Sequence, residues 1–191
     1  MAVGDVPGPA PEGFLRAVAS LRAARLRPEI VLTEVPGPQR IAPYAVAVTA
    51  DVVVEGTELA TGRFVLLHDP AGQDAWEGTY RAVTFVRAEL EPETGIDPLL
   101  GQVGWAWLEE SLAQAGAHAV AVGGTVTRVL SEGFAALGDR PASVELEVRA
   151  SWTPVGDDLE PHLRGWGDLL CTVAGLPPLP EGVAALPRRL R

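Results

Sequence analysis

Four segments near the start of the chain have the composition of β-strands, and the stretches between them are too short for crossover helices. Each segment is rich in β-branched and aliphatic residues, which favours extended structure. The middle two are separated only by Glu55–Glu58, a spacing that predicts a hairpin. Because parallel strands need a connection of about a dozen residues or more, these strands are predicted to pair antiparallel. The four segments are Ile30–Val35, Tyr44–Val54, Leu59–His68 and Thr79–Leu90.

Three helices and two more strands complete the predicted order. The fold class is α+β: an antiparallel sheet of about five to six strands with three helices on one face, in the order α-β-β-β-β-α-β-β-α. Thr79–Leu90 alternates in a strand-like way, although a helix stays open there. The helices are predicted from Pro11 to Pro28, from Asp97 to Ala115 with Gly116 after its end, and from Asp158 to Gly175; the later strands are His118–Val129, with a bulge at Gly123–Gly124, and Ser143–Trp152.

The domain organisation follows from composition. Residues 1–10 are rich in Gly, Pro and Ala and are predicted to be disordered, and residues 11–176 are predicted to form a single α+β domain. Residues 177–191 are broken by prolines and are predicted to form an extended tail.

Helical periodicity predicts which helix residues are buried. In the first helix, Phe14, Leu15, Val18 and Leu21 recur at helical spacing. On the second helix Leu100, Gly104, Leu108 and Leu112 form an apolar stripe flanked by Trp105 and Trp107, and Glu109 and Glu110 lie opposite, so these carboxylates are interpreted as solvent-facing rather than catalytic. The last helix has one apolar face with Leu159, Leu163, Trp166, Leu170, Val173 and Ala174, and Cys171 is predicted to be a half-buried, inert thiol at its boundary.

Charge and cysteine content exclude several classes of protein. The chain has 15 basic residues, all arginine, against 25 acidic ones, a formal net charge of −10. Such a chain repels phosphate backbones, so nucleic-acid binding is not expected, and lysine chemistry is excluded. The single cysteine, Cys171, rules out an intrachain disulfide. No membrane-spanning segment and no signal peptide are evident, and a cytoplasmic location is expected.

No cofactor or metal is expected. The chain has three histidines, His68, His118 and His162, and none lies at a metal-ligand spacing from another. The glycine pair Gly123–Gly124 lacks the helix and spacing of a phosphate-binding loop.

The most distinctive polar segment runs from Gly62 to Arg81. Arg63, His68, Asp69, Trp76 and Arg81 are the candidate binding residues, because two arginines and an aromatic ring can hold a carboxylate-bearing or peptide ligand. The alternative is purely structural: the arginines pair with Asp69, Asp74 or Glu77 and the tryptophan pins a long loop.

The chain resembles an actinobacterial family of uncharacterised proteins, known as domain of unknown function 3000. The stretches that carry the resemblance cover most of the chain after residue 12, and the family brings no assigned activity. They are "ELATGRFVLLHDPAGQDAWEGTYR", "DPLLGQVGWAWLEESL", "GGTVTRVLSEGF", "VRASWTPVG" and "LLCTVAGLPPLP".

The order of elements is also loosely similar to secretion-chaperone-like folds, which bind partner polypeptides, with one extra strand before the middle helix. The leading hypothesis is therefore a non-enzymatic, protein-binding or chaperone-like module whose partner is another protein or a second copy of the chain. The alternative is a small enzyme with its site in the His68–Arg81 loop, where His68 is the base and Asp69 or Glu77 orients it.

Overall fold

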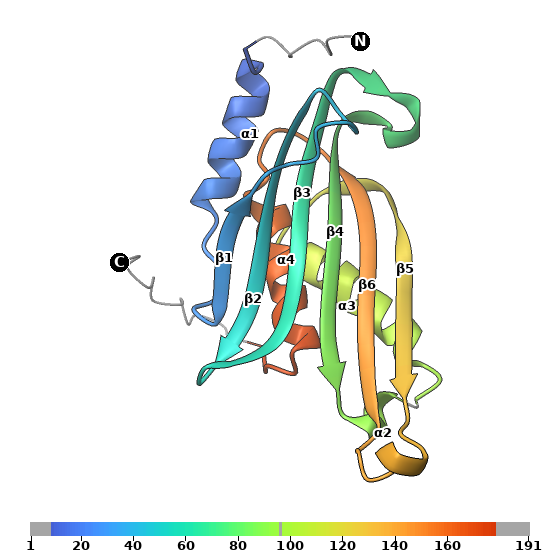
Figure 1. Ribbon diagram of the computed structural model, residues 1–191. Coiled ribbons are helices and arrows are strands. Elements are labelled where there is room, and N and C mark those ends of the chain that lie inside the picture. The colour runs from blue at the N-terminus through green and yellow to red at the C-terminus, as the bar shows by residue number, and fades with distance from the viewer. Residues whose placement is uncertain (1–8, 96, 179–191) are drawn as a thin grey trace, which may run out of the picture.

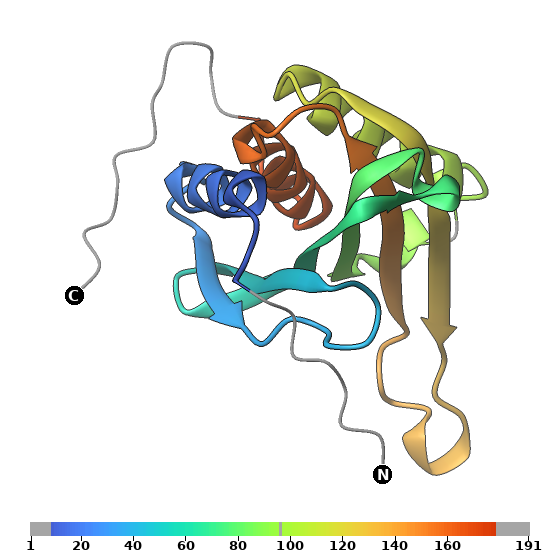
Figure 2. The same cartoon turned by 90° about the horizontal axis from the view of Figure 1, so that it is seen from above.

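Six strands form one sheet in which every neighbouring pair is antiparallel, in the order β1-β2-β3-β4-β6-β5. The computed structural model describes residues 9–95 and 97–178. Helices α1, α3 and α4 lie on one face of the sheet (Figures 1 and 2). The elements are α1 (Glu12–Ala23), β1 (Ile30–Val35), β2 (Tyr44–Val54), β3 (Thr57–Gln73), β4 (Gly78–Leu90), α2 (Pro92–Gly95), α3 (Leu100–Gln114), β5 (Ala119–Ser131), β6 (Ser143–Pro154) and α4 (Glu160–Val173), with short 3₁₀ turns at Asp74–Trp76 and Ala135–Leu137.

The predicted fold class is confirmed, and the differences are local. The sheet is antiparallel and has helices on one face, as expected from the short connections. The one-turn helix α2 was not predicted, because a four-residue segment carries no helical periodicity. In the described part of the chain, no helix has the length and apolar character needed to cross a membrane. The predictions for residues 1–8 and 179–191 lie outside the described residues.

The β2–β3 hairpin is tighter than predicted. The bounds of β1 and β2 are as predicted, but the turn consists of Glu55 and Gly56 alone rather than four residues. Both residues have positive φ, 51° and 85°, as a two-residue turn between twisted strands requires. Strand β3 also continues past His68 to Gln73, so half of the residues between the predicted strands Leu59–His68 and Thr79–Leu90 are extended structure.

Strand β4 resolves the alternative left open for Thr79–Leu90. Tyr80, Ala82, Thr84 and Val86 are buried, and the residues between them face the uncovered side of the sheet. A period of two is the pattern of a strand, so the helix is excluded.

The core is centred on three aromatic side chains. Phe64, Trp152 and Trp166 are each at most 1% exposed. The Phe64 ring centroid lies 6.2 Å from that of Trp152 and 5.8 Å from that of Trp166. Gly62 makes room for this packing, because a Cβ atom there would lie 2.8 Å from the Trp166 ring. The Trp166 ring can therefore pack against β3 only because residue 62 is a glycine.

Helix α4 is buried on more sides than its apolar stripe predicts. The predicted face is buried except for Ala174, which is partly buried, and His162, Leu169 and Cys171 are also no more than 2% exposed. Two glycines explain the difference. A Cβ atom on Gly165 would lie 3.0 Å from an α3 carbonyl oxygen, and one on Gly167 would lie 3.0 Å from the Leu26 side chain. Neighbours therefore approach α4 closely on both flanks, and the prediction that Cys171 is half-buried is wrong.

The ends of the helices differ from the prediction by a few residues. Helix α1 ends at Ala23 rather than before Pro28, and Leu15 is 55% exposed, because Ala17 takes the buried position instead. Helix α3 begins at Leu100 rather than Asp97, although the Asp97 carboxylate accepts a hydrogen bond from the Leu99 N–H at 2.8 Å.

The buried stripe of α3 and the residue after the helix are as predicted. Leu100, Gly104, Leu108 and Leu112 are buried, whereas Glu109 and Glu110 are exposed. Gly116 has a φ of 73°, the left-handed conformation typical of a residue that ends a helix.

Helix α1 caps helix α4. The hydroxyl oxygen of Ser20 accepts hydrogen bonds from the backbone N–H groups of Leu159 at 2.8 Å and Glu160 at 2.9 Å. The carboxylate of Asp158, where the helix was predicted to begin, accepts a longer hydrogen bond from the Glu160 N–H at 3.3 Å and one from the Ser20 hydroxyl at 2.7 Å. The two helices are thus fixed to each other at the N-terminus of α4.

The irregularity in β5 lies just before the predicted glycine bulge. The register against β6 shifts between Val120 and Gly123, and Ala121 has a φ of 49°. Gly124 is needed for a different reason, since a Cβ atom there would overlap the carbonyl oxygen of Arg149.

Candidate functional site

His68, one of the five predicted binding residues, faces the core. Its side chain is 6% exposed, and its ring stacks on Tyr80 with centroids 4.4 Å apart and on Phe14 at 5.6 Å. Its Nδ1 lies 3.0 Å from the carbonyl oxygen of Thr79. Because a carbonyl oxygen only accepts, Nδ1 carries the proton and donates it.

Trp76 is also enclosed. The residue is 9% exposed, and its carbonyl oxygen accepts a hydrogen bond from the Thr153 hydroxyl. Its ring is therefore not an exposed platform for a ligand.

Arg81 lies on the uncovered face of the sheet and joins three strands. From β4 its guanidinium donates to Ser151 Oγ on β6 at 2.7 Å and to the carbonyl oxygen of Ala121 on β5 at 2.8 Å. Ala121 belongs to the bulge, so Arg81 satisfies a carbonyl group that the regular ladder leaves unpaired. Burial lowers the pKa of Arg81, while Glu77 raises it.

Arg63 and Asp69 make separate local contacts. Arg63 donates to the carbonyl oxygen of Pro36 at 3.2 Å, and Asp69 accepts from the Ala71 N–H and the Gln73 amide, both at 3.1 Å. Arg63 and Arg81 share the uncovered face, but β4 pairs Arg81 with Leu67, four residues along β3 from Arg63, or about 13 Å. The structure therefore does not bring the five residues together. Within the described residues, neither arginine forms an ion pair with Asp69, Asp74 or Glu77.

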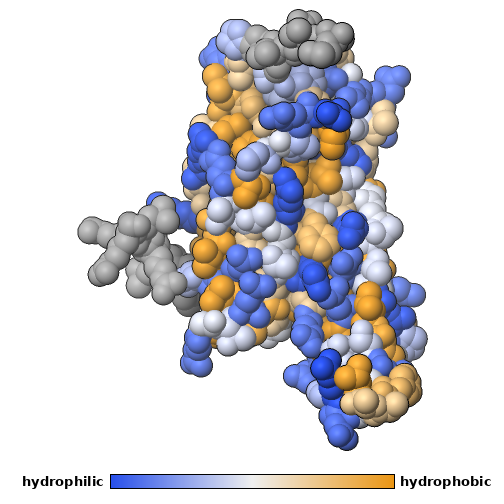
Figure 3. Space-filling view, in the orientation of Figure 1, coloured by the Kyte–Doolittle hydropathy of each residue, from blue (hydrophilic) through white to orange (hydrophobic). Residues whose placement is uncertain are grey.

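The uncovered face carries a shallow hollow of about 370 Å³ around Phe85. It lies between Arg63 and Arg149, with Val65 and Val83 as its other apolar walls. The Arg149 guanidinium sits 5.0 Å from the centre of the Phe85 ring, within the range of a cation–π contact, and also pairs with Glu147. Figure 3 shows this face as a mixture of hydrophilic and hydrophobic side chains without one dominant patch.

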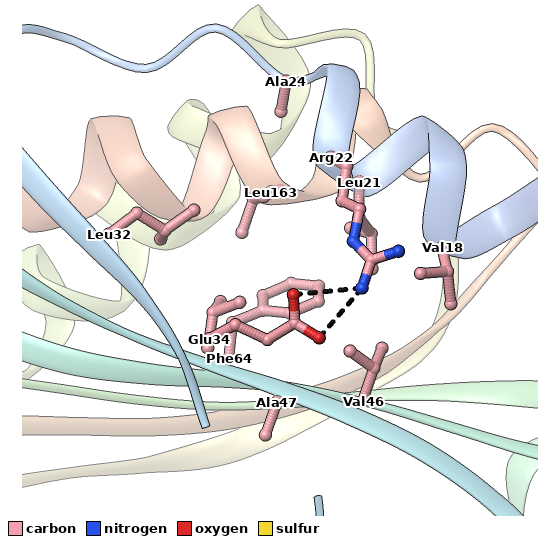
Figure 4. A pocket seen from close by; sticks show the side chains of 11 residues that line it. Val18, Leu21, Arg22, Ala24, Leu32, Glu34, Val46, Ala47, Phe64 and Leu163 are labelled. Carbon is pink, nitrogen blue, oxygen red and sulfur yellow. Dashed lines mark hydrogen bonds and ion pairs between the residues drawn. The ribbon is translucent and has the colours of Figure 1, made fainter. Parts of the chain in front are cut away.

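A better-formed cleft lies on the helical side, between α1 and the strands β1 and β2. Its volume is about 230 Å³. Its floor is made by Phe64 and Leu163, each 1% exposed, and its walls are mostly aliphatic (Figure 4). The cleft exists because α1 covers β1 poorly: Leu32, on the inner face of that strand, is 41% exposed. The lining residues are Val18, Leu21, Arg22, Ala24, Leu32, Glu34, Val46, Ala47, Val48, Phe64 and Leu163.

One ion pair spans this cleft. Nη2 of Arg22 on α1 donates to both carboxylate oxygens of Glu34 on β1, at 2.9 and 3.1 Å (Figure 4). The two side chains are 65% and 56% exposed. Exposed pairs of this kind contribute only about 0–1 kcal/mol, so little free energy holds the pair closed.

Comparison with known proteins places the chain in a family. It matches the family described as "Protein of unknown function (DUF3000)" over residues 10–184. The chain belongs to the DUF3000 family. No curated protein and no solved structure matches it.

The titratable groups in the described part of this DUF3000 chain do not form a metal site. Among residues 9–95 and 97–178, no group of three or more His, Cys, Asp or Glu side chains could hold a metal ion. Burial raises the pKa of Cys171 to about 12 and lowers that of His162 to about 4. Both groups are therefore neutral at pH 7 and lie in the core rather than in the cleft.

The sequence hypothesis missed the cleft because its walls come from five separate elements. Only Leu32 and Glu34, two residues apart on a short strand, showed in the sequence that one face of β1 carries both an apolar and a charged side chain. That pattern indicates that β1 is an edge strand, but it does not indicate which element packs over the strand.

Proposed function

We propose that this DUF3000 protein is a cytoplasmic, non-enzymatic protein-binding module of actinobacterial origin, which holds an apolar side chain of a partner polypeptide in the cleft between α1 and β1–β2. The observation that carries the proposal is a concave, mostly aliphatic surface that ends on buried core residues and stays open to solvent. Burial of apolar area is the main source of affinity in protein association.

The shape of the cleft favours a side chain over a free small molecule. Its volume of about 230 Å³ is below the roughly 300–1,000 Å³ of most small-molecule sites. Its only charged groups, Arg22 and Glu34, are already paired, and exposed. A partner segment with a bulky apolar residue next to a charged one fits both features, because its charge can exchange with one member of the weak ion pair.

Two further points support a partner of this kind. The order of elements is loosely like that of secretion-chaperone-like folds, which bind polypeptides, although fold likeness alone does not determine function. Of the five predicted binding residues, Arg63 is exposed, and it donates only to a backbone carbonyl within the described residues. We propose it as a secondary contact for a partner carboxylate.

The enzyme alternative has less support. His68, its proposed base, is 6% exposed, and within the described residues its only hydrogen-bond partner is the Thr79 carbonyl, not Asp69 or Glu77.

The test compares two arginine substitutions at exposed leucines. Leu32→Arg puts a charge at the cleft, whereas Leu15→Arg puts the same charge on α1 at a residue that does not line it. A partner captured from the native cytoplasm, identified by mass spectrometry and purified, is expected to bind the Leu32→Arg variant at least tenfold more weakly than the wild type. The Leu15→Arg variant is expected to bind it normally. Equal affinity for all three proteins, each with an unchanged melting temperature, would contradict the proposal.

A further inference from the structure

Strand β5 forms an edge of the sheet with unusual exposure of apolar side chains. Among residues 9–95 and 97–178, it pairs with β6 on one side and with no strand on the other. Four of its aliphatic residues are 40–52% exposed: Val120, Val122, Val129 and Leu130. An uncovered edge of this kind offers unpaired N–H and C=O groups to another strand.

The charge of β5 differs from that of the rest of the chain. The chain has a net charge of −10, but residues 119–131 contain no Asp or Glu and one charged residue, Arg128. The opposite edge, β1, is only six residues long, carries Glu34 and runs into Pro36. Charges, prolines and shortness are the features that keep edge strands apart. On β5 these features are limited to the bulge at Ala121 and to Arg128, whose guanidinium donates to the carbonyl oxygen of Asp97, and the stretch from Gly123 to Ser131 pairs regularly with β6.

The connection between β5 and β6 carries a second apolar surface. The hairpin projects from the body of the molecule, away from the helices (Figures 1 and 2). Phe134 is 76% exposed and Leu137 is 49% exposed near its tip. Apolar atoms gather at this end in the space-filling view (Figure 3).

We propose that a second copy of this chain adds to the β5 edge, so that two six-stranded sheets join into one across a two-fold axis near Thr127. A two-fold axis requires the two β5 strands to run antiparallel, with the same surface used by both copies. Centring the regular stretch on the axis pairs Thr127 with Thr127 and Thr125 with Val129. It also places Leu130 opposite Gly124, where the partner has no side chain.

This register accounts for the other exposed residues. Because Ser131 lies opposite Gly123, the chain beyond Ser131 continues alongside the partner's bulge. The tip residues Phe134 and Leu137 of each copy then approach Val120 and Val122 of the other. An acid-free strand also brings two chains of net charge −10 together without facing carboxylates across the contact.

The mass in solution gives the first test. Sedimentation equilibrium or light scattering of the full chain is expected to show a species of twice 20.1 kDa that persists at high salt, because no ion pair holds it. Leu130→Glu is expected to weaken dimerisation at least tenfold. Val83→Glu, at a residue 38% exposed on β4 away from the edge, is expected to leave it unchanged.

Cysteine cross-linking tests the register. Thr125 and Thr127 are exposed, and the native Cys171 is buried and does not compete. With oxidised glutathione, Thr127→Cys is expected to form an intermolecular disulfide faster than Thr125→Cys, because only a residue on the axis meets itself.

Three outcomes would overturn the proposal: a chain that stays at 20.1 kDa at every soluble concentration, a dimer that Leu130→Glu leaves intact, or faster cross-linking at Thr125 than at Thr127. The β5 edge and the α1–β1 cleft lie at opposite sides of the sheet, so failure here leaves the proposed function standing, and the reverse also holds.

Discussion

The stability of this protein is expected to fall in mild acid because of one buried histidine. His162 on α4 is 1% exposed, and its Nδ1 accepts a hydrogen bond from Trp152 Nε1 at 3.0 Å. A nitrogen that accepts carries no proton, so the imidazole is neutral. Burial lowers its pKa to about 4; Asp158 raises this pKa, and His118 lowers it.

The sign and size of the effect follow from proton linkage. The folded protein binds this proton with a pKa of about 4, and the unfolded chain binds it at the ordinary 6.5. Stability is therefore fully present above pH 6.5 and is lost as the pH falls toward 4. At about 1.4 kcal/mol per pH unit, the full loss is ~3 kcal/mol, a large part of the 5–15 kcal/mol typical of a domain.

Urea unfolding of wild type and His162→Asn at pH 7 and pH 4 measures this contribution. Asparagine cannot titrate, and its side-chain oxygen can accept the Trp152 proton in place of Nδ1. Carboxylates also titrate in this range, but they do so in both proteins, so the difference between the two isolates His162. His118→Asn, at an exposed histidine whose effect on the His162 pKa is the smallest of the three named causes, serves as the control and should differ from the wild type far less than His162→Asn does. If the free-energy difference between wild type and His162→Asn is the same at both pH values, the imidazole is not the neutral, buried group described above.

Three further outcomes follow from burial and hydrogen bonding. Trp166→Ala should destabilise the fold by about 3–5 kcal/mol in urea melts. Glu110→Ala, on the exposed side of α3, should destabilise it by less than about 0.5 kcal/mol. A comparable loss of stability in both variants would contradict the assignment of Trp166 to the core. Cys171, 2% exposed with its pKa raised to about 12, should resist alkylation in the native protein at pH 7, which mass spectrometry checks against the unfolded chain. Arg81→Ala should lower the melting temperature, because the carbonyl oxygen of Ala121 and the Ser151 hydroxyl lose their donor; an unchanged melt would show that water replaces it.

The sheet could be predicted from the sequence because the residues that favour strands and turns act locally along the chain. Strand β1 and strand β2 have the predicted bounds, since prolines and turn residues flank alternating or β-branched segments. The extension of β3 to Gln73 could not be predicted, because Asp69 and Pro70 are poor strand formers, and the pairing with β4 breaks after His68 and resumes only at Gln73.

The environment of α4 and the cleft depend on tertiary contacts. The helical periodicity of α4 predicts one apolar stripe. It cannot predict that α3 packs closely against Gly165 and that the Leu26 side chain packs closely against Gly167. Tertiary structure also separates the five predicted binding residues, although they are close in sequence. His68 lies in the core, whereas Arg81 lies on the uncovered face of the sheet. The absence of Asp and Glu from residues 119–131 can be read from the sequence, but only the structure places this segment at an edge of the sheet.

Helix α4 is the last helix or strand in the described part of the chain, and yet it fills the centre of the core. Until Glu160–Val173 has been synthesised, the inner face of the sheet around Phe64 and Trp152 lacks its principal cover. At roughly 5–20 residues per second, about 5–20 s pass between the synthesis of Phe64 and the completion of α4. The core is then completed only after α4 has been synthesised, and a chain that stops before α4 has all six strands but leaves the inner face of its sheet exposed. The nascent chain is expected to depend on holding chaperones at this stage, and a truncation before Glu160 is expected to aggregate rather than to fold into a smaller domain.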